Sequence, residues 1–267
     1  MNTLMIDNDT ILGEFKNMIS QKYEHHRPRL LILLGNPSLL LRDEYRELWG
    51  DIPIVLCSEE KFIGPKDTYI YKQPVTQAER VPISQLADPY NLVLLYSNLY
   101  LRENIQLISH IIPDMKKFIF IGDEREINQT NNLEIQTKLK AINHNIEYQN
   151  ITPQKMTTNQ LLDSLYHVDP NTTFASNTSF VTNAHKLIVT TTAPIFTLNM
   201  ADITEENGGM IGGYTYDQKH YNQQLIHTIS EILTGKPARE IPFYMPSDGA
   251  PIINYTILLR KGFSPSM

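Results

Sequence analysis

The sequence has only one cysteine, Cys57, so it can form neither an internal disulfide nor a site built from several thiolates. Cys57 lies in the apolar segment IPIVLC, where a buried cysteine is the ordinary interpretation and a reactive thiol is the alternative. The 8 histidines are scattered without the spacing of metal ligands. We therefore expect no bound metal and no cofactor.

Long apolar runs and tracts of positive charge are also missing. No segment reaches the roughly 18 apolar residues that span a bilayer, and no export signal follows Met1. Lys and Arg number 23 against 29 Asp and Glu, a formal charge of −6 that argues against nucleic acid as a partner. The chain fits either a cytosolic protein or a fragment separated from its targeting and membrane segments.

Signatures of catalysis are absent too. The sequence contains no G-x-S-x-G motif, no P-loop and no pair of carboxylates at an informative spacing. The segment GGMIGGYTYD lacks the G-x-G-x-x-G spacing of dinucleotide sites, and its glycines indicate a flexible crossover or close backbone packing. A cytosolic α/β transferase stays an alternative, because a fold does not determine an activity.

The pattern that is present is an alternation of short apolar strands with amphipathic helices. It predicts the α/β class, with parallel sheets covered by helices. Residues 58–90 are weakly periodic, and only TYIYKQ suggests an edge strand there. Strands are predicted within 29–37 and at 52–57, 91–97, 116–123, 146–151, 172–177 and 194–199. Helices are predicted from about 38 to 50, at 101–112, 130–143, 157–167 and 179–190, and from Asp217 to Gly235.

One polar turn occurs twice. LLGNPSLL aligns without a gap on FASNTSFV at a separation of 141 positions, which pairs Asn36 with Asn177 and Ser38 with Ser179. The same offset sets DIPIVLC over TAPIFTL. Chance identity is one explanation, and the other is two homologous βαβ halves, each with its own parallel sheet.

Ligands of open parallel sheets lie outside the carboxyl ends of the strands, so two such sheets with these ends facing would enclose a cleft. The alternatives are helix capping for the Asn and Ser residues, a solvated loop charge for Glu59 and core packing for Tyr214. Few positive residues lie near these turns, which favours a neutral polar or aromatic ligand. The candidate ligand-binding residues are Asn36, Ser38, Ser58, Glu59, Tyr96, Ser97, Asn177, Ser179, Asp202 and Tyr214.

Three segments carry a family resemblance. NGGMIGGYTYDQKHYNQQLIHTISEILTGKPAREIPFYMP resembles ABC transporter substrate-binding proteins, in which a Gly-rich segment precedes a long helix and an LxGxPAxxIP turn. The ending PIINYTILLRKGF resembles the closing strand and helix of that family. PRLLILLGNPSLLLRDEYRELWGDIPIVLCSEE resembles the extracellular sensor region of bacterial two-component histidine kinases, especially hybrid ones.

The resemblance implies a type I periplasmic-binding-protein fold with two Rossmann-like lobes joined by three crossovers. Lobe 1 is expected at 1–97 plus about 214–244, and lobe 2 at 98–213 plus about 245–267. It further implies a non-enzymatic, periplasmic or extracytoplasmic sensor domain that binds a small molecule in the cleft and is tethered to a membrane helix of its parent protein. A soluble substrate-binding protein of an ABC importer is the alternative.

The sequence departs from the family at both ends. The resemblance gives the family's opening strand and helix no counterpart before MNTLMIDNDTILGEF, and the chain stops just after the closing element, as expected of a fragment. A missing first strand would leave one sheet with an open edge, which could promote pairing between chains and is compatible with a homodimer.

Overall fold

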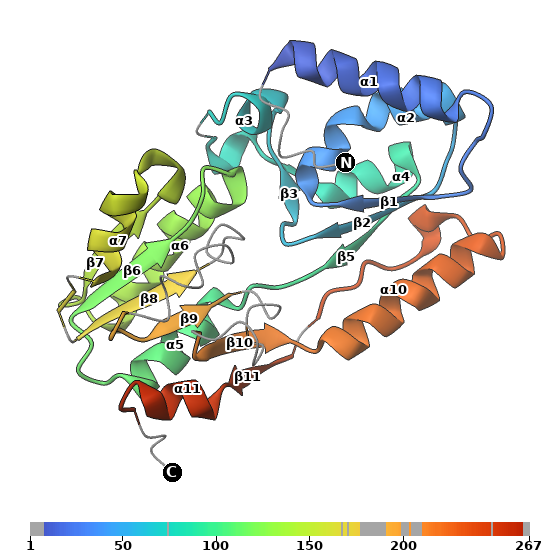
Figure 1. Ribbon diagram of the computed structural model, residues 1–267. Helices are drawn as coiled ribbons and strands as arrows, with labels where there is room; N and C mark the ends of the chain where they lie inside the picture. The colour runs from blue at the N-terminus through green and yellow to red at the C-terminus, as the bar shows by residue number, and fades with distance from the viewer. Residues whose placement is uncertain are drawn as a thin grey trace. The chain divides into compact units, whose positions relative to one another are not determined.

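The computed structural model describes residues 8–263 except 74, 167, 170, 177–190, 199–202, 204–209 and 247. It divides into two compact units, shown in Figure 1. Unit 1 comprises Met1–Asn98 and Tyr216–Asp248, and unit 2 comprises Leu99–Thr215 and Gly249–Met267. The chain therefore crosses between the units three times, and the expected lobe boundaries lie one to four residues from these crossings.

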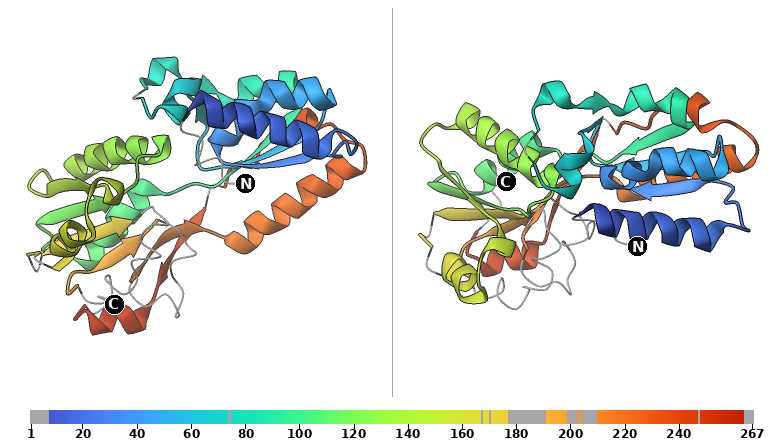
Figure 2. Two further views of the ribbon diagram at one scale, coloured as in Figure 1. Left: turned by 45° about the horizontal axis from the view of Figure 1, so that its top comes forward. Right: turned by 90° about the horizontal axis from the view of Figure 1, so that it is seen from above.

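Unit 1 contains a parallel sheet in the order β1 (Leu31–Leu34), β2 (Ile54–Ser58) and β5 (Leu92–Tyr96). Tyr244 forms a parallel bridge beyond β5, at Leu95. Apolar residues of the strands pack on one face against α1 (Asp9–Tyr23) and α2 (Arg42–Trp49). The other face packs against α10 (Gln218–Leu233), which lies across the sheet from α1 in Figure 2.

Smaller elements connect the strands of unit 1. A two-stranded antiparallel sheet pairs β3 (Phe62–Ile63) with β4 (Val81–Pro82). The remaining short helices and 3-10 turns are η2 (Asn36–Leu41), α3 (Lys66–Ile70), η3 (Gln77–Glu79), η4 (Ile83–Leu86), α4 (Ala87–Tyr90) and η7 (Ala238–Glu240).

The edge strand predicted at TYIYKQ is wrong, because the first half of that segment, residues 68–70, belongs to α3 and no strand is formed in the second half. The extended Pro65 precedes the helix, and both Thr68 and Ile70 are buried within unit 1. Tertiary burial therefore outweighs the strand preference of a segment rich in Tyr, Thr and Ile.

Unit 2 contains a six-stranded sheet in the order β11-β10-β9-β8-β6-β7. The strands β6 to β10 run parallel in each described pairing. Helices α5, α6 and α11 cover one face and α7 covers the other. The strands are β6 (Lys117–Ile121), β7 (Glu147–Ile151), β8 (Thr172–Ser176), β9 (Ile195–Thr197), β10 (Gly212–Tyr216) and β11 (Gly249–Ile253). The helices are α5 (Leu101–Ile111), α6 (Glu126–Ile142), α7 (Thr158–Tyr166) and α11 (Tyr255–Arg260), with the 3-10 turn η5 (Pro153–Lys155).

The glycines of β10 permit close strand packing. Gly212 has a φ of 145°, and a Cβ at this position would lie 2.0 Å from the Ile252 carbonyl oxygen. A Cβ on Gly213 would lie 2.1 Å from the Thr197 carbonyl oxygen. Only glycine fits between β9 and β11, so of the two roles considered for this segment the structure confirms close backbone packing.

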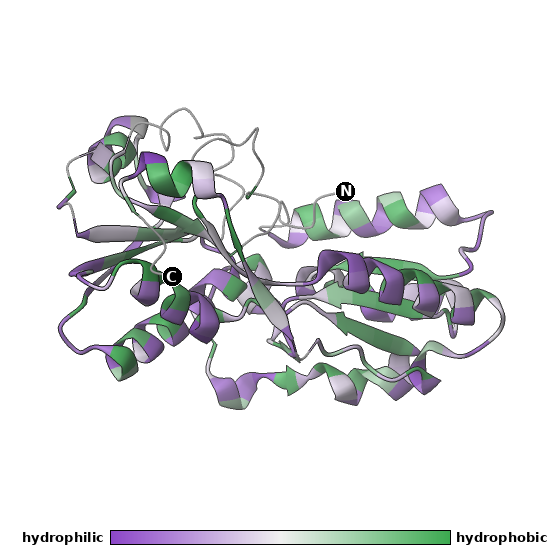
Figure 3. Cartoon of the chain, turned by 90° about the horizontal axis from the view of Figure 1, so that it is seen from below, coloured by the Kyte–Doolittle hydropathy of each residue, from purple (hydrophilic) through white to green (hydrophobic). Residues whose placement is uncertain are grey.

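The mixed α/β fold with parallel sheets is confirmed, and hydropathy explains its layers. In Figure 3 the unit 1 strands are mostly hydrophobic, whereas the helices carry hydrophobic and hydrophilic residues together. Such helices bury one stripe and expose the other. Across the described residues, we find no helix with the length and apolar content needed to cross a membrane.

The internal repeat is present in the strand order but not in the gapless alignment. Leu31 lies opposite Ile54 in unit 1, and Phe174 lies opposite Ile195 in unit 2. The strands β2 and β9 are thus 141 positions apart in the sequence, whereas β1 and β8 are 143 positions apart. The difference arises because, counted between paired residues, the connection from β8 to β9 is two residues shorter than the connection from β1 to β2. An even shift preserves which side chains share a face, but Asn36 and Asn177 are not equivalent when the strands are matched.

Candidate functional site

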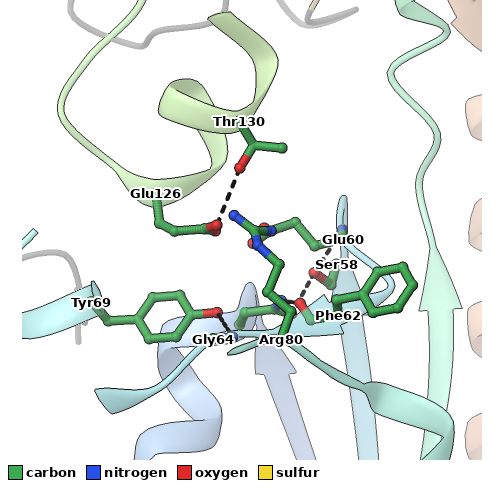
Figure 4. Close-up of polar contacts among 9 residues, drawn as sticks. Ser58, Glu60, Phe62, Gly64, Tyr69, Arg80, Glu126 and Thr130 are labelled. Carbon is green, nitrogen blue, oxygen red and sulfur yellow. Dashed lines mark hydrogen bonds and ion pairs between the residues drawn. The ribbon is translucent and has the colours of Figure 1, made fainter. Parts of the chain in front are cut away.

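The carboxyl ends of β1, β2 and β5 lie at one edge of the unit 1 sheet, because the three strands are parallel. Asn36 follows β1 and is 1% exposed. Its Nδ2 donates to the Phe62 carbonyl oxygen at 2.6 Å, and its Oδ1 accepts from Ser58 Oγ at 2.8 Å. Ser58 Oγ also accepts from the Glu60 amide at 3.1 Å (Figure 4). These bonds fix the loops after β1 and β2 to each other.

Helix capping does not explain Asn36. The residue that caps η2 is Gly35, which has a φ of 74°, and no side chain caps this turn. Ser38 Oγ donates to the Gly35 carbonyl oxygen at 2.5 Å. Since Asn36, Ser38 and Ser58 are all buried and bonded within unit 1, they position the loops, and their contact with a ligand stays a prediction.

The more accessible residues of this edge are Glu59, which is exposed, and Tyr96 and Ser97, which are partly exposed. Lys61 Nζ lies 4.5 Å from the centre of the Tyr96 ring, a cation–π contact. The Ser97 amide donates to the Ser58 carbonyl oxygen at 2.9 Å. These three predicted residues are therefore the ones at this edge with surface available to a ligand.

A charged pair that the sequence did not reveal lies at the same edge. Arg80 Nη1 is 3.6 Å from Glu60 Oε1, and the two side chains are 9% and 10% exposed. Figure 4 shows this pair with Tyr69, whose hydroxyl accepts from the Gly64 amide at 3.0 Å. Burial, followed by the Glu60 carboxylate, raises the pKa of Tyr69 to about 12. The phenol of Tyr69 is therefore neutral at pH 7.

Arg80 is held by local structure that the sequence does contain. Thr76 and Glu79 form a capping box around η3, with the Thr76 amide donating to Glu79 Oε2 at 2.8 Å, and Arg80 follows directly. The T-x-x-E spacing is the signal that could have located it. The expectation that few positive residues lie near these turns is wrong, because Arg80 and Lys61 are both at this edge.

An aromatic cluster lies at the end of β5 in unit 1. The ring centres of Tyr216 and Tyr221 are 5.2 Å apart, and those of Tyr221 and Tyr244 are 5.9 Å apart. The Tyr221 hydroxyl donates to the Leu95 carbonyl oxygen at 3.1 Å. Burial, followed by the Glu59 carboxylate, raises the pKa of Tyr216. Burial also raises the pKa of the half-buried Cys57 thiol, which favours an unreactive cysteine over a nucleophile.

Tyr214 belongs to a set of contacts within unit 2 near the chain crossings. Its amide donates to Asn104 Oδ1 at 2.7 Å, and Asn104 Nδ2 donates to the Tyr214 carbonyl oxygen at 2.8 Å. Asn104 Nδ2 also lies 3.0 Å from the Leu99 carbonyl oxygen. The Tyr214 hydroxyl donates to the Gly249 carbonyl oxygen at 2.9 Å. These bonds tie together the unit 2 ends of all three crossings, which favours a structural role for Tyr214.

The carboxyl edge of unit 2 also holds polar side chains. Asp123 accepts from Arg125 Nε at 2.8 and 2.7 Å and from Asn128 Nδ2 at 2.7 Å. Glu126 accepts from Thr130 Oγ1 at 3.1 Å (Figure 4). Ser176, at the end of β8, is 0% exposed, and its Oγ has no hydrogen-bond partner among the described residues. The predicted residues Asn177, Ser179 and Asp202 lie outside the described residues.

A surface hollow of about 410 Å³ lies elsewhere in unit 1, at the end of α2 that precedes β2. This is the amino-terminal side of the sheet, so the hollow is not at the edge where parallel sheets bind ligands. Within the part of the chain that the structure describes, no three His, Cys, Asp or Glu residues are grouped as metal ligands. The hollow is lined by Ser20, Gln21, Tyr23, Glu24, Arg27, Leu48 and Trp49.

A fold of two α/β units with crossing segments, and polar loops at the carboxyl ends of parallel strands, defines the class of periplasmic-binding-protein-like ligand-binding proteins. The family model of the ABC transporter substrate binding protein matches residues 83–264. This chain belongs to that family, and the predicted resemblance to it is confirmed.

Solved structures show the same fold. An ABC domain from Streptococcus pneumonia, in complex with L-Trp, is 14% identical, with a TM-score of 0.63 over 95% of this chain and 82% of that one. A conserved domain protein from Vibrio cholerae is 17% identical, with a TM-score of 0.62 over 94% and 79%. A ligand-free, open substrate binding protein with adhesive properties from Clostridium difficile is 14% identical, with a TM-score of 0.56 over 94% and 79%. No curated protein matches this chain.

Proposed function

We propose that this protein binds a small zwitterionic ligand, an amino acid with an aromatic or large apolar side chain, and delivers it to an ABC importer. The observation that carries the proposal is the Glu60–Arg80 pair beside Tyr69 at the carboxyl edge of the unit 1 sheet. A guanidinium binds a carboxylate in a two-pronged geometry, and a carboxylate binds an ammonium group. The pair thus holds, at this edge, one group of the kind that binds each charge of an α-amino acid, and ligand binding would exchange contacts that the two side chains already make for contacts with the ligand.

The aromatic preference rests on residues at the same edge. Tyr96 and Phe62 are partly exposed, and Tyr96 already contacts a cation, Lys61, through its ring. Aromatic faces stack on flat apolar groups of a ligand. The L-Trp complex of the fold neighbour from Streptococcus pneumonia supports this ligand class. A zwitterion is neutral overall, so the proposal agrees with the neutral polar or aromatic ligand expected from the sequence. The premise that few positive residues lie near these turns was nevertheless wrong, since Arg80 and Lys61 lie there.

A sensor domain of a two-component histidine kinase is the second candidate function. Its support is the resemblance of residues 28–60 to such sensors. In both cases the chain acts outside the cytoplasm as a binding protein and not as an enzyme, and ligand capture shifts the population toward a ligand-bound conformation. The coding sequence around this chain distinguishes them, since a membrane helix and kinase following it would favour the sensor and a lipoprotein signal preceding it would favour the importer.

Calorimetric titration of the purified chain with L-Trp, L-Tyr, L-Phe and L-Leu tests the ligand class. Sugars and purines are titrated in the same way as the competing ligand classes. Tryptamine lacks the carboxylate and N-acetyl-L-tryptophan lacks the ammonium group. We expect each to bind at least about tenfold more weakly than L-Trp, because each leaves one charge of the pair unmatched. An amino acid at about 100 times its dissociation constant should raise the free energy of unfolding by about 2.7 kcal/mol.

Substitution of the pair tests the site. Arg80→Gln and Glu60→Gln should each weaken amino-acid binding by roughly 10- to 100-fold, since each removes a charge-assisted hydrogen bond. Arg46→Gln is the matched control, because Arg46 is half exposed and contacts Asp43 on α2, away from this edge. Unchanged affinity in a folded Arg80→Gln variant would show that the assignment of the site is wrong. Binding of a sugar in place of any amino acid would overturn the ligand class.

A further inference from the structure

The short helix α3 holds Tyr69 in place in unit 1. The two residues on either side of it, Thr68 and Ile70, are 2% and 1% exposed, and the Tyr69 ring packs against the unit 1 core. The turn before the helix is tight, since a Cβ on Gly64 would lie 3.4 Å from Thr68 Oγ1. Packing of the ring and of its neighbours therefore fixes where the Tyr69 hydroxyl lies.

The oxygen of the Tyr69 hydroxyl accepts two hydrogen bonds. The Gly64 amide donates to it at 3.0 Å, and the Asn36 side chain bonds it as well. Burial and then the Glu60 carboxylate raise the pKa of Tyr69, whereas the Asn36 bond acts to lower it, which is the sign expected when Asn36 is the donor. The amide group of Asn36 has two protons, and Nδ2 also donates to the Phe62 carbonyl oxygen at 2.6 Å.

The proton of the Tyr69 hydroxyl has no acceptor among the described residues. Two N–H groups occupy the acceptor positions of the oxygen, so the O–H proton is left for donation. The phenol keeps this proton at pH 7, because its pKa is about 12. A partly buried donor without an acceptor is unfavourable, so this hydroxyl points to an acceptor that a ligand would supply.

This hydroxyl lies beside the pair that is proposed to bind the ligand. Figure 4 shows it directed from α3 toward Gly64 and Arg80. The charges of Glu60 and Arg80 both act on the phenol, in opposite directions. The Tyr69 O–H and the Arg80 guanidinium are both donors at this edge, and the oxygens of a carboxylate accept hydrogen bonds from donors of both kinds.

We propose that Tyr69 is a ligand-binding residue that donates its hydroxyl proton to the carboxylate of the ligand, next to Arg80. The inference rests on the proposed function and adds a specificity to it. A carboxylate has two acceptor oxygens, so one can accept from Arg80 and the other from Tyr69. Because the phenol is neutral, it strengthens the binding of a free carboxylate without disturbing the balance of charge between Glu60 and Arg80.

Calorimetric titration of a Tyr69→Phe variant tests the role of the hydroxyl. L-Trp and N-acetyl-L-tryptophan have a carboxylate, whereas tryptamine has none. The substitution should weaken binding of both carboxylates at least about tenfold, since it removes a hydrogen bond to a charged group. It should leave the affinity for tryptamine unchanged.

Tyr90→Phe is the matched control. It also removes a hydroxyl of unit 1, one that donates to Asp43 at 2.7 Å, but Tyr90 ends α4 on the amino-terminal side of the sheet. This variant should bind all three ligands as the wild type does.

The comparison between ligands separates donation to the ligand from a structural role. Tyr69→Phe also leaves the Gly64 amide without its acceptor, and a loop disturbed by that loss would bind tryptamine and L-Trp equally poorly. Equal weakening of all three ligands, or an unchanged affinity for L-Trp, would overturn the proposal.

Incorporation of 3-fluorotyrosine at position 69 decides the question if Tyr69→Phe does not fold. This replacement keeps the ring and the hydroxyl and makes the O–H a stronger donor. It should tighten binding of L-Trp and leave binding of tryptamine unchanged. An affinity for L-Trp that does not increase would then overturn the proposal.

Failure of this inference and failure of the proposed function give different results. If no amino acid binds, or if Arg80→Gln and Glu60→Gln bind L-Trp as tightly as the wild type, the proposed function is wrong and this inference is wrong with it. If those two variants weaken binding of L-Trp and Tyr69→Phe does not, the proposed function stands and only the role of Tyr69 is wrong.

Discussion

The two units share one plan but complete it to different extents. In unit 1, β1, β2 and β5 are neighbours in that order, and in unit 2 β8, β9 and β10 are neighbours in the same order. Unit 2 continues past β8 with β6 and β7, whereas β1 is the last strand on its side among the described residues of unit 1. The same strand is thus central in one unit and at the edge in the other.

This difference shows that the surroundings of a strand, more than its own residues, decide what is buried. Ala175 in β8 is 1% exposed because β6 and β9 flank it and a helix layer covers it. Ile32 occupies the equivalent place in β1 and is 46% exposed, although isoleucine is far more hydrophobic than alanine. An apolar residue that no neighbour covers contributes little to stability.

The largest expected effect comes from removing the same side chain at a covered and at an uncovered position. Leu139 in α6 is 1% exposed and packs on the covered face of unit 2, whereas Leu34 is 72% exposed in β1. Leu139→Ala should lower the free energy of unfolding by about 2–5 kcal/mol, since it leaves a cavity. Leu34→Ala should lower it by less than about 0.5 kcal/mol, as for other surface substitutions.

Urea unfolding at low protein concentration measures both values, with circular dichroism for the whole chain. The single tryptophan, Trp49, is 6% exposed and packs in the unit 1 core, so its fluorescence reports on unit 1. A Leu34→Ala variant as unstable as Leu139→Ala would show that the edge of β1 is covered, and the contrast between the units would fail.

The next effect concerns the unit 2 ends of the three crossings. Asn104→Ala removes the amide that bonds both the N–H and the C=O of Tyr214, which leaves these partly buried backbone groups without that partner. We expect a loss of about 2–3 kcal/mol in the free energy of unfolding and faster hydrogen exchange at the Tyr214 amide. Asn222→Ala, at an exposed position of α10 in unit 1, is the control. Unchanged exchange at Tyr214 would contradict this role for Asn104.

Most strands of the two parallel sheets and the long helices α5, α6 and α10 could be predicted from sequence because their apolar patterns are local. The long helix α10 is an example, since Asp217, where this helix was predicted to begin, is its cap residue and accepts from the His220 amide at 3.0 Å. The helix α1 was missed even though Asn8 caps it and accepts from the Ile11 amide at 2.9 Å. Leu12 and Phe15 form its buried side, and this spacing could have indicated a helix.

The candidate site was harder to predict because its parts come from different elements. Glu60 and Arg80 are 20 positions apart and meet only when β3 and β4 pair. The bond from Ser58 to Asn36 likewise depends on strand register. Sequence located the strand ends, but which polar residues there bond one another and which face a ligand depends on loop geometry that no periodicity encodes.

A smaller effect is expected at Ser58 and Ser176, the last residues of β2 in unit 1 and of β8 in unit 2. Ser58 Oγ takes part in two hydrogen bonds in unit 1, whereas Ser176 Oγ of unit 2 has none to the described residues. Ser58→Ala should lower the free energy of unfolding by about 1–2 kcal/mol, because the Asn36 Oδ1 loses its donor. Ser176→Ala should change it by less than about 0.5 kcal/mol. Equal losses in urea unfolding would remove this difference between the units.

The smallest effect is a pH dependence confined to unit 1. Hydrogen bonds from Lys66 and then from Tyr71 hold the pKa of Asp9 below its usual value of 3.8. Because the folded state has the lower pKa, this contribution to stability is present above about pH 4 and is lost as the pH falls through the folded value. Asp9→Asn should therefore lower the urea midpoint at pH 6 slightly and show a weaker decline than wild type under more acidic conditions.

Trp49 provides the readout for this last prediction, since the Tyr23 ring at the end of α1 packs edge-on against it at 5.8 Å. Acid should change Trp49 fluorescence in the wild type before it changes the circular dichroism of the whole chain. Glu14→Gln, in the same helix, is the matched control. If Asp9→Asn and wild type gave parallel midpoints from pH 6 to pH 3, the contacts of Asp9 would not stabilise α1. The cover that α1 provides over its face of the unit 1 sheet would then depend on apolar packing alone.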